Sequence, residues 1–196
     1  MPRLALAFPL VGTGSLGAED QLVARLRAGD LAALGEAYDA HHAHVRAFAA
    51  RLVGDPAAAE DLVQETFLSL PRAAARFRGD SSLRTFLVAI AVRHAGHHVR
   101  SAARRRAAVA RLGREPGAAM TTPEDDLDRA RLAAALTRAL DALPLDQRVA
   151  VVLCEVEERT SGEAARIAGV PEGTVRTRLM HAKRKLVDLL EKEGIQ

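Results

Sequence analysis

The most strongly charged part of this 196-residue chain is a run of arginines that suits contact with a polyanion. Between Arg93 and Arg114 there are seven Arg and no acidic residue. Between Glu115 and Asp128 the pattern reverses, with five acidic residues and no Lys or Arg. Because the formal net charge is only +3, the uneven placement is more informative than the total. A basic face of this density fits a phosphate backbone, and the alternative is the solvated end of an ordinary helix.

A second basic segment begins at Thr160 and has the pattern of a helix-turn-helix. Thr160 and Glu163 have the spacing of a capping box, in which each side chain binds the backbone of the other. Gly169 supplies a tight turn, and Pro171 precedes a second helix. That helix would bury Val175, Leu179, Ala182, Leu186 and Leu189. The alternative is an amphipathic helical hairpin without a ligand.

The exposed side of this second helix carries side chains that read or hold DNA. A recognition helix presents its N-terminal half to base edges in the major groove. Arg bonds guanine with two hydrogen bonds, and Thr offers a methyl and a hydroxyl group. Lys and Arg farther along the helix suit phosphates. The candidate contacts are Thr174, Arg176, Thr177, Arg178, Met180, His181 and Lys183.

The composition favours helices throughout. Aromatic residues make up only 3% of the chain and Trp is absent, whereas Ala, Leu and Arg are abundant helix formers. The low aromatic content argues against a β-sheet RNA reader, which needs aromatic stacking platforms. We therefore expect an all-α protein.

Start and stop signals divide the chain into expected helices. One covers 22–27, and a long one runs from the cap at Asp30 to Gly54 with an apolar stripe from Leu31 to Leu52. A third starts at Asp55-Pro56 and should kink or end before Pro71, because proline cannot donate the helical hydrogen bond. A fourth helix should begin at a serine cap at the end of the 77–82 loop. A fifth should cover 123–143, with one leucine face from Leu132 to Leu143, and a sixth should cover 145–156.

These elements predict two small helical domains and a linker. We expect a disordered leader over 1–18, a helical domain over 19–112, a flexible linker over 113–122 and the helix-turn-helix domain over 123–196. No apolar run has the roughly 20 residues needed to cross a membrane, so we expect no membrane insertion. The expected location is the cytoplasm, with which a single cysteine is compatible.

Histidine and cysteine placement favours structural roles. His41 with His44, and His94 with His97 or His98, have spacings that could bring two metal ligands together, but no matching Cys or carboxylate set accompanies them. We therefore expect no metal and no cofactor. A single cysteine excludes an intrachain disulfide. The absence of a phosphate-binding loop, a nucleophile elbow and a paired-carboxylate motif argues against an enzyme.

Three segments together resemble extracytoplasmic-function (ECF) sigma factors of the sigma-70 family. Residues 59–68 (AEDLVQETFL) resemble the segment that binds core RNA polymerase. Residues 76–87 (RFRGDSSLRTFL) are similar to the promoter-melting region. Residues 169–179 (GVPEGTVRTRL) resemble the helix that reads the minus-thirty-five element. Three motifs in family order are far more specific than one.

The resemblance implies two helical domains, known as regions 2 and 4, and no catalysis. Its partners would be promoter DNA, core RNA polymerase through the β′ clamp helices and the β flap, and an anti-sigma factor. The polymerase-docking residues would be Asp61, Leu62, Gln64, Glu65 and Leu68, of which Leu62 also suits the core.

The resemblance also places contacts with the minus-ten element. A loop would hold a base flipped from the opened duplex, offsetting a few kcal/mol of lost stacking. The loop residues are Phe77, Arg78, Gly79, Asp80, Ser81 and Ser82, and Arg84, Arg93, His97 and Arg100 would follow the nearby DNA.

Some positions depart from the family pattern. Leu70 and Phe86 stand where Trp is common, and Pro71 and Arg93 are unusual. Cys154 stands where an Arg often reaches DNA. The promoter sequence is therefore expected to differ from common ones.

Two other functions compete with this interpretation. One is a dimeric helix-turn-helix regulator that binds duplex DNA without polymerase, but such a regulator has no need for the segment at 59–68. The other is a sigma-like protein that binds polymerase without opening promoters.

Overall fold

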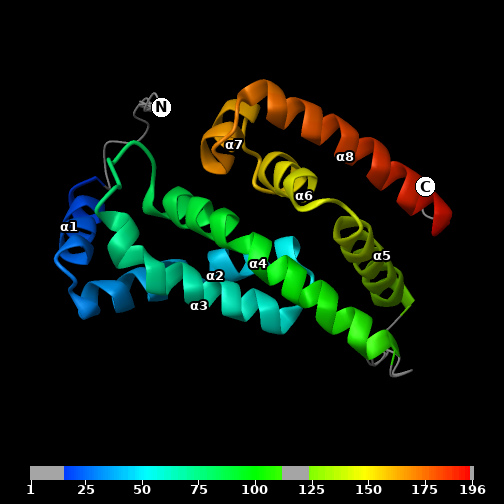
Figure 1. The fold of residues 1–196 in the computed structure, drawn as a ribbon, viewed down its shortest axis with the longest axis horizontal. Coiled ribbons are helices and arrows are strands. Elements are labelled where there is room, and N and C mark those ends of the chain that lie inside the picture. The colour runs from blue at the N-terminus through cyan, green and yellow to red at the C-terminus, as the bar shows by residue number, and fades with distance from the viewer. Residues whose placement is uncertain (1–15, 112–123, 195–196) are drawn as a thin grey trace.

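The computed structural model describes residues 16–111 and 124–194, and every regular element in these two ranges is helical (Figure 1). The leader predicted over 1–18 therefore lies mostly outside the described residues, although α1 already covers its last three positions. The linker predicted over 113–122 also lies outside them. The elements are α1 (Leu16–Arg27), α2 (Leu31–Val53), α3 (Pro56–Ala74), α4 (Leu83–Arg111), α5 (Glu124–Asp141), α6 (Leu145–Val151), the π-helical turn η1 (Val152–Val156), α7 (Ser161–Ala168) and α8 (Glu172–Lys192).

Helices α1 to α4 form the first unit, and its core is made by one face of each helix. Phe48 and Leu52 of α2, Leu62 of α3 and Leu87 of α4 are all fully buried. Burying side chains of this size removes apolar surface from water, at roughly 1.5–3 kcal/mol for each one. The core therefore fixes how α3 and α4 lie side by side.

The helix caps that the sequence predicts are confirmed. The Asp30 carboxylate accepts from the backbone N–H of Ala32 at 2.8 Å, and that of Asp55 accepts from Ala58 at 2.7 Å. Gly54 ends α2 in the left-handed conformation, with φ of 66°. These short-range contacts satisfy backbone groups that a helix end leaves unpaired.

The structure corrects the prediction that α3 ends before Pro71. The helix continues through Pro71 to Ala74. Leu70 and Ala74, on either side of the proline, are both buried in the core. Packing of this last turn therefore outweighs the hydrogen bond that proline removes.

Two predicted apolar stripes are wrong at their N-terminal ends. Leu31, at the start of α2, is 80% exposed, and on α5 Leu132 and Leu136 are also exposed. The packing of the helices leaves these positions open to solvent, which the spacing of apolar residues alone does not reveal.

Helices α5 to α8 form the second unit, which contains the predicted helix-turn-helix. The helix predicted over 145–156 is present, but its second half is the π-helical turn η1. The predicted capping box opens α7: the backbone N–H of Thr160 donates to Glu163 Oε2 at 2.9 Å, and that of Glu163 donates to Thr160 Oγ1 at 3.3 Å. Val175 and Ala182 of α8 are buried, whereas Leu179, Leu186 and Leu189 are only half-buried.

The two units lie side by side along the long axis of the molecule (Figure 1). Helix α7 packs on α4, and α5 and α6 pack against α2. One apolar cluster runs through both units, from Phe48 and Ala95 to Val152, Leu153 and Ala164. Within the described ranges, no helix is both long enough and apolar enough to cross a membrane.

Replacing the capping threonine gives a test of how the helix-turn-helix is stabilised. Thr160→Ala should lower the free energy of unfolding by about 1 kcal/mol, because the backbone N–H of Glu163 loses its acceptor. The control is Thr137→Ala on α5, where the hydroxyl only donates to the Ala133 carbonyl within the helix. Urea unfolding measures both, and an equal loss in the two variants would contradict a specific role of the cap.

Candidate polymerase-docking and nucleic-acid interfaces

The predicted polymerase-docking residues lie on α3, and most of them face solvent. Asp61, Gln64 and Leu68 are exposed, and Leu68 is 75% exposed despite its apolar side chain. Leu62 is fully buried and belongs to the core. The exposed face of α3 is therefore polar, with one apolar side chain, Leu68. Leu62 lies on the opposite, buried side of the helix and packs in the core.

Glu65 is held by two histidines of the neighbouring helix α4. Its Oε1 lies 2.9 Å from His94 Nδ1, and its Oε2 lies 2.5 Å from His98 Nε2. The side-chain hydrogen bond with His98 is the main cause that lowers the pKa of Glu65. The sequence showed the spacing of His94 and His98, but not that a carboxylate of α3 lies between them. This contact joins the docking helix to α4.

The loop 77–82 is anchored at its first residue. Phe77 is buried, and its ring lies 4.9 Å from that of Phe86. Arg27 of α1 donates to the backbone carbonyl of Phe77. Phe77 therefore supports the loop from the core.

The remaining loop residues are partly or fully exposed. Gly79 adopts φ of 77°, which favours glycine, and Asp80 and Ser81 are half-exposed. The predicted serine cap is confirmed, because Ser82 Oγ accepts from the backbone N–H of Thr85 at 3.2 Å. The loop thus presents polar groups between two fixed ends.

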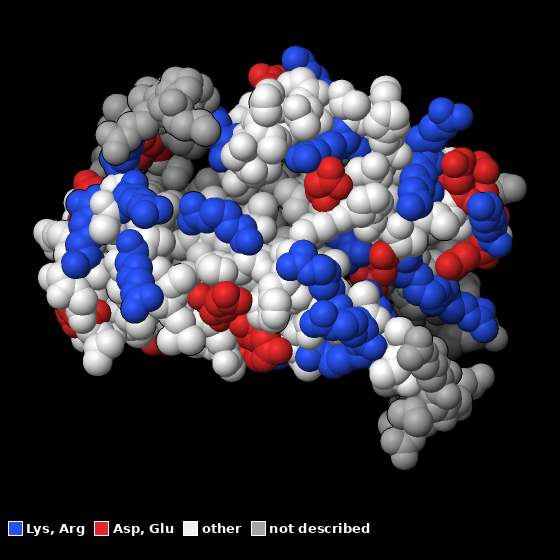
Figure 2. Space-filling model, viewed as in Figure 1, with Lys and Arg blue, Asp and Glu red and all other residues white. Residues whose placement is uncertain are grey.

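The outward side of α4 carries a basic stripe that extends beyond the predicted contacts. Arg93, His97, Arg100 and Arg104 are exposed and follow steps of four, three and four residues, which places them on one side of a helix. That side is opposite the buried residues of α4. None of the three arginines forms an ion pair within the described part of the chain. We call this set the α4 stripe, and Figure 2 shows Lys and Arg gathered over the second half of α4.

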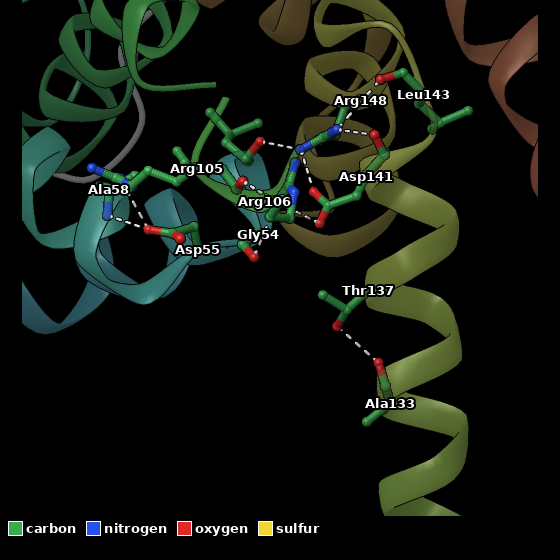
Figure 3. Close-up of polar contacts among 12 residues, drawn as sticks. Gly54, Asp55, Ala58, Arg105, Arg106, Ala133, Thr137, Asp141, Leu143 and Arg148 are labelled. Atoms are coloured by element: carbon green, nitrogen blue, oxygen red, sulfur yellow. Dashed lines mark hydrogen bonds and ion pairs between the residues drawn. The ribbon is translucent and has the colours of Figure 1, made fainter. Parts of the chain in front are cut away.

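Arg104 is the member of the α4 stripe that the sequence analysis did not select. The next two arginines along the chain each form an ion pair: Arg105 lies 3.1 Å from Asp55, and Arg106 lies 3.0 Å from Asp141 (Figure 3). The helical spacing from Arg100 could have selected Arg104, but the sequence did not distinguish it from these paired neighbours.

On α8 the candidate DNA contacts differ in how freely they can reach DNA. Arg176 is 66% exposed and makes an ion pair within its own helix, with Glu172 at 3.4 Å. Arg178 is 29% exposed and is bound to Asp146 of α6 at 3.0 Å. Lys183 reaches Glu155 of η1 at 2.8 Å. The ion pair of Arg178 therefore links α8 to α6, whereas the side chain of Arg176 is exposed to solvent.

The other candidates on α8 are less constrained. Thr177, Met180 and His181 are exposed, and Met180 is 60% exposed. Thr174 is half-buried near the start of the helix. The hydroxyl of Thr177 donates to the Gly173 carbonyl at 3.0 Å. The exposed side of α8 is thus open along the half that a recognition helix presents to bases.

Metal and thiol chemistry have little support in the described residues. No group of three or more His, Cys, Asp or Glu side chains in these ranges is arranged to hold a metal ion. Cys154 is half-buried, and burial is the main cause that raises the pKa of its thiol, which disfavours the reactive thiolate.

Together these features are typical of a helix-turn-helix DNA-binding protein whose first domain adds a basic helix, α4, and the exposed face of α3. Comparison with known proteins gives the family. Sigma-70 region 2 matches residues 37–105, and Sigma-70 region 4 matches residues 133–186. The ECF RNA polymerase sigma factor SigM of Mycobacterium tuberculosis is 32% identical over 191 residues, covering 93% of this chain and 90% of SigM.

Solved structures show the same fold. CnrH in complex with the cytosolic domain of CnrY has a TM-score of 0.60 and 25% identity, covering 89% of this chain and 98% of CnrH. The sigma factor RpoE in complex with the anti-sigma factor NepR from Bartonella quintana has a TM-score of 0.56 and 28% identity, covering 76% of this chain and 91% of RpoE.

The chain therefore belongs to the ECF sigma factors of the sigma-70 family. It directs promoter-specific initiation of transcription, and it is an initiation factor rather than an enzyme.

Neutralising Glu65 tests whether its contacts with His94 and His98 stabilise the folded protein. Because its pKa is lowered in the folded protein, the stabilisation it provides is present above its unfolded pKa and is lost as the pH falls through the folded value. Glu65→Gln should therefore flatten the fall in melting temperature between about pH 5 and pH 3. Glu60→Gln, in an exposed ion pair on the same helix, is the control. Identical pH profiles for wild type and Glu65→Gln would contradict this role.

Arg176 and Arg178 should respond differently to truncation. Arg176→Ala should weaken binding of its preferred promoter by about 1–3 kcal/mol and relax base preference at one position if it bonds a guanine. Arg178→Ala should mainly lower the melting temperature, because it breaks the tie to Asp146. Holoenzyme binding to a panel of promoter variants measures the first effect. An equal loss on all sequences for Arg176→Ala would make it a phosphate contact instead.

Proposed function

We propose that the chain docks on core RNA polymerase through α3, reads the minus-thirty-five element through α8 and holds melted minus-ten DNA with α4 and the 77–82 loop. The single observation that carries this proposal is the distribution of exposed groups over the first unit. The docking side of α3 and the α4 stripe are both open to solvent, on adjacent helices that Glu65 joins. The two helices can therefore serve polymerase and DNA at the same time.

Capture of an unpaired base fits the loop between Phe77 and Leu83. A flipped base needs polar groups that meet its Watson–Crick edge and a rigid support behind them. Asp80, Ser81 and Ser82 provide the polar groups, while buried Phe77 and the cap of α4 fix the two ends. The α4 stripe would follow the adjacent phosphates.

Charge placement on α8 favours readout of bases near its start and of phosphates near its end. Arg176 and Thr177 lie in the first half of the helix, and exposed Arg184 and Lys185 lie beyond its midpoint. Base contacts give specificity, whereas phosphate contacts set the position of the helix. An Arg bound to a phosphate or guanine would exchange its weak surface pair with Glu172 for a stronger contact.

An anti-sigma protein is the proposed regulator, and the cytoplasm is the proposed location. RpoE, which shares this fold, was solved in complex with the anti-sigma factor NepR. Such a partner would act by covering one or more of the three exposed surfaces described above. The β′ clamp helices are the proposed polymerase site for α3, and the β flap is the proposed site for region 4.

Transcription in vitro tests the proposed function. Core polymerase, the purified chain and fragmented genomic DNA of the host should yield transcripts whose start sites share two upstream elements. Asp61→Ala combined with Gln64→Ala should reduce polymerase binding without changing the melting temperature, because both side chains are exposed. If the chain binds duplex DNA but never yields promoter-specific transcripts, the regulator without polymerase becomes the better account.

The α4 stripe gives a quantitative prediction. Arg104→Ala should reduce the slope of log binding constant against log salt by about 0.7–0.9 for the holoenzyme on promoter DNA, because one phosphate contact on melted or adjoining duplex DNA and its released counterion are lost. Arg105→Ala removes the same charge one residue away, where the guanidinium is paired with Asp55, and should leave the slope nearly unchanged. Equal slopes for Arg104→Ala and wild type would exclude the contact.

A further inference from the structure

The C-terminal end of α1 is bonded to the chain where it enters the 77–82 loop. Arg27, the last residue of α1, donates through Nε to the backbone carbonyl of Ala74, at the end of α3, at 3.0 Å. Its Nη2 donates to the carbonyl of Phe77, the first residue of the loop. A helix leaves its last carbonyls without intrahelical partners, and its dipole makes that end negative. A guanidinium is therefore well suited to the end of α3.

The N-terminal part of α1 is bonded to the chain where it leaves the loop. The backbone N–H of Leu83, the first residue of α4, donates to Glu19 Oε1, 64 residues away in the sequence. The first amides of a helix also lack intrahelical partners, and the dipole makes this end positive, which favours a carboxylate. Ser82 Oγ accepts from a second amide, that of Thr85. Helix α4 thus begins with one acceptor from the loop and one from α1.

The spacing along α1 suits this double contact. Glu19 and Arg27 are eight residues apart, which is about 12 Å along a helix axis. At about 3.6 residues per turn, they lie on the same side of α1 as the buried side chains of Leu22, Val23 and Leu26. Those apolar side chains belong to the core of the first unit, so the two charged groups keep a set separation. Figure 1 shows α1 at the end of that unit where α3 leads into α4. A third helix therefore spans the two ends of the loop.

The middle of the loop has few contacts of its own. Positions 78–81 are exposed or half-exposed. Within the described part of the chain, their side chains make one hydrogen bond, from Ser81 Oγ to the carbonyl of Ser82 at 3.4 Å. Where the polar groups of the loop lie is therefore decided mainly by where its two ends are held.

We propose that Glu19 and Arg27 are positioning residues for base capture, because they set the distance between the two ends of the 77–82 loop. This inference rests on the proposed capture of an unpaired minus-ten base by that loop. Both side chains act through the backbone at the loop ends rather than through the base. A binding site keeps its selectivity only while its polar groups stay within about 0.5 Å of their productive positions. Losing either contact frees one end of the loop and lowers its selectivity.

Abasic substitution in minus-ten DNA tests the role of α1. Holoenzyme is bound to single-stranded minus-ten DNA of a mapped promoter, and to copies that lack one base at a time. The ratio of dissociation constants, abasic to intact, at the most sensitive position is the abasic penalty. Glu19→Gln and Arg27→Gln should each lower the abasic penalty about 5-fold or more, because a misplaced loop distinguishes a base from its absence less well.

Arg25→Ala is the matched control on the same helix. Arg25 forms exposed ion pairs with Asp30 at 2.8 Å and with Glu36 at 2.7 Å, and among the described residues it makes no hydrogen bond to the loop. This variant should keep the wild-type abasic penalty. All three variants should bind core polymerase and duplex minus-thirty-five DNA like wild type, with every measurement made well below the melting temperature of each variant.

The outcomes separate failure of this inference from failure of the proposed function. A wild-type abasic penalty in both Glu19→Gln and Arg27→Gln overturns the role of α1 and leaves the proposed function intact. An equal decrease in Arg25→Ala, or an equal loss of minus-thirty-five binding, also overturns it, because the effect would then be a general loss of structure. If the wild-type holoenzyme shows no abasic penalty at any minus-ten position, the proposed base capture itself fails.

Discussion

The contact on which the arrangement of the molecule most depends is the buried guanidinium of Arg148. A charge enclosed in a largely apolar interface is tolerated only when its partners are all in place, and removing one partner costs several kcal/mol. Burial is the main cause that lowers the pKa of Arg148, and the neighbouring Asp141 carboxylate opposes that shift. The carbonyl of Leu52 and the Asp141 carboxylate come from different units. Moving the units apart would therefore separate Arg148 from the Leu52 carbonyl and Arg106 from Asp141, while the Arg148–Asp141 pair within the second unit would remain.

The functional surfaces follow from how polar contacts fix neighbouring helices. Glu65 joins α3 to α4, so the proposed docking face and the α4 stripe are held at a fixed position relative to each other. Arg178 joins α8 to α6, and Lys183 joins it to η1, so the recognition helix keeps its angle within region 4. Within each unit polar contacts join neighbouring helices, whereas between units the contacts of Arg148 and Arg106 add to a shared apolar cluster. Motion between units is then the simplest route to a promoter with two separated elements.

Much of the fold was predictable because its signals are local. Asp30, Asp55 and the Thr160–Glu163 box each act over two or three residues, so their roles are visible in the sequence. The prediction that the helix ends before Pro71 is wrong, because the packing of Leu70 and Ala74 in the core outweighs the tendency of proline to end a helix. The functional surfaces were predictable as helices and motifs, but not in detail. Whether an arginine faces solvent, as Arg104 does, or is bound across the fold, as Arg148 and Arg178 are, depends on partners far away in the chain.

The distance between the two units is the most direct test of this account. Spin labels at two exposed positions, Ala47 of α2 and Asp188 of α8, report it by pulsed electron resonance in a Cys154→Ser background. The account predicts one narrow, short distance distribution for the chain alone. In complex with core polymerase and promoter DNA, the distance should increase by on the order of 60 Å, because the two elements lie about 85 Å apart on the duplex and the packed helices only about 20 Å. An unchanged distribution in a complex that transcribes from the promoter would contradict separation of the two units on the promoter.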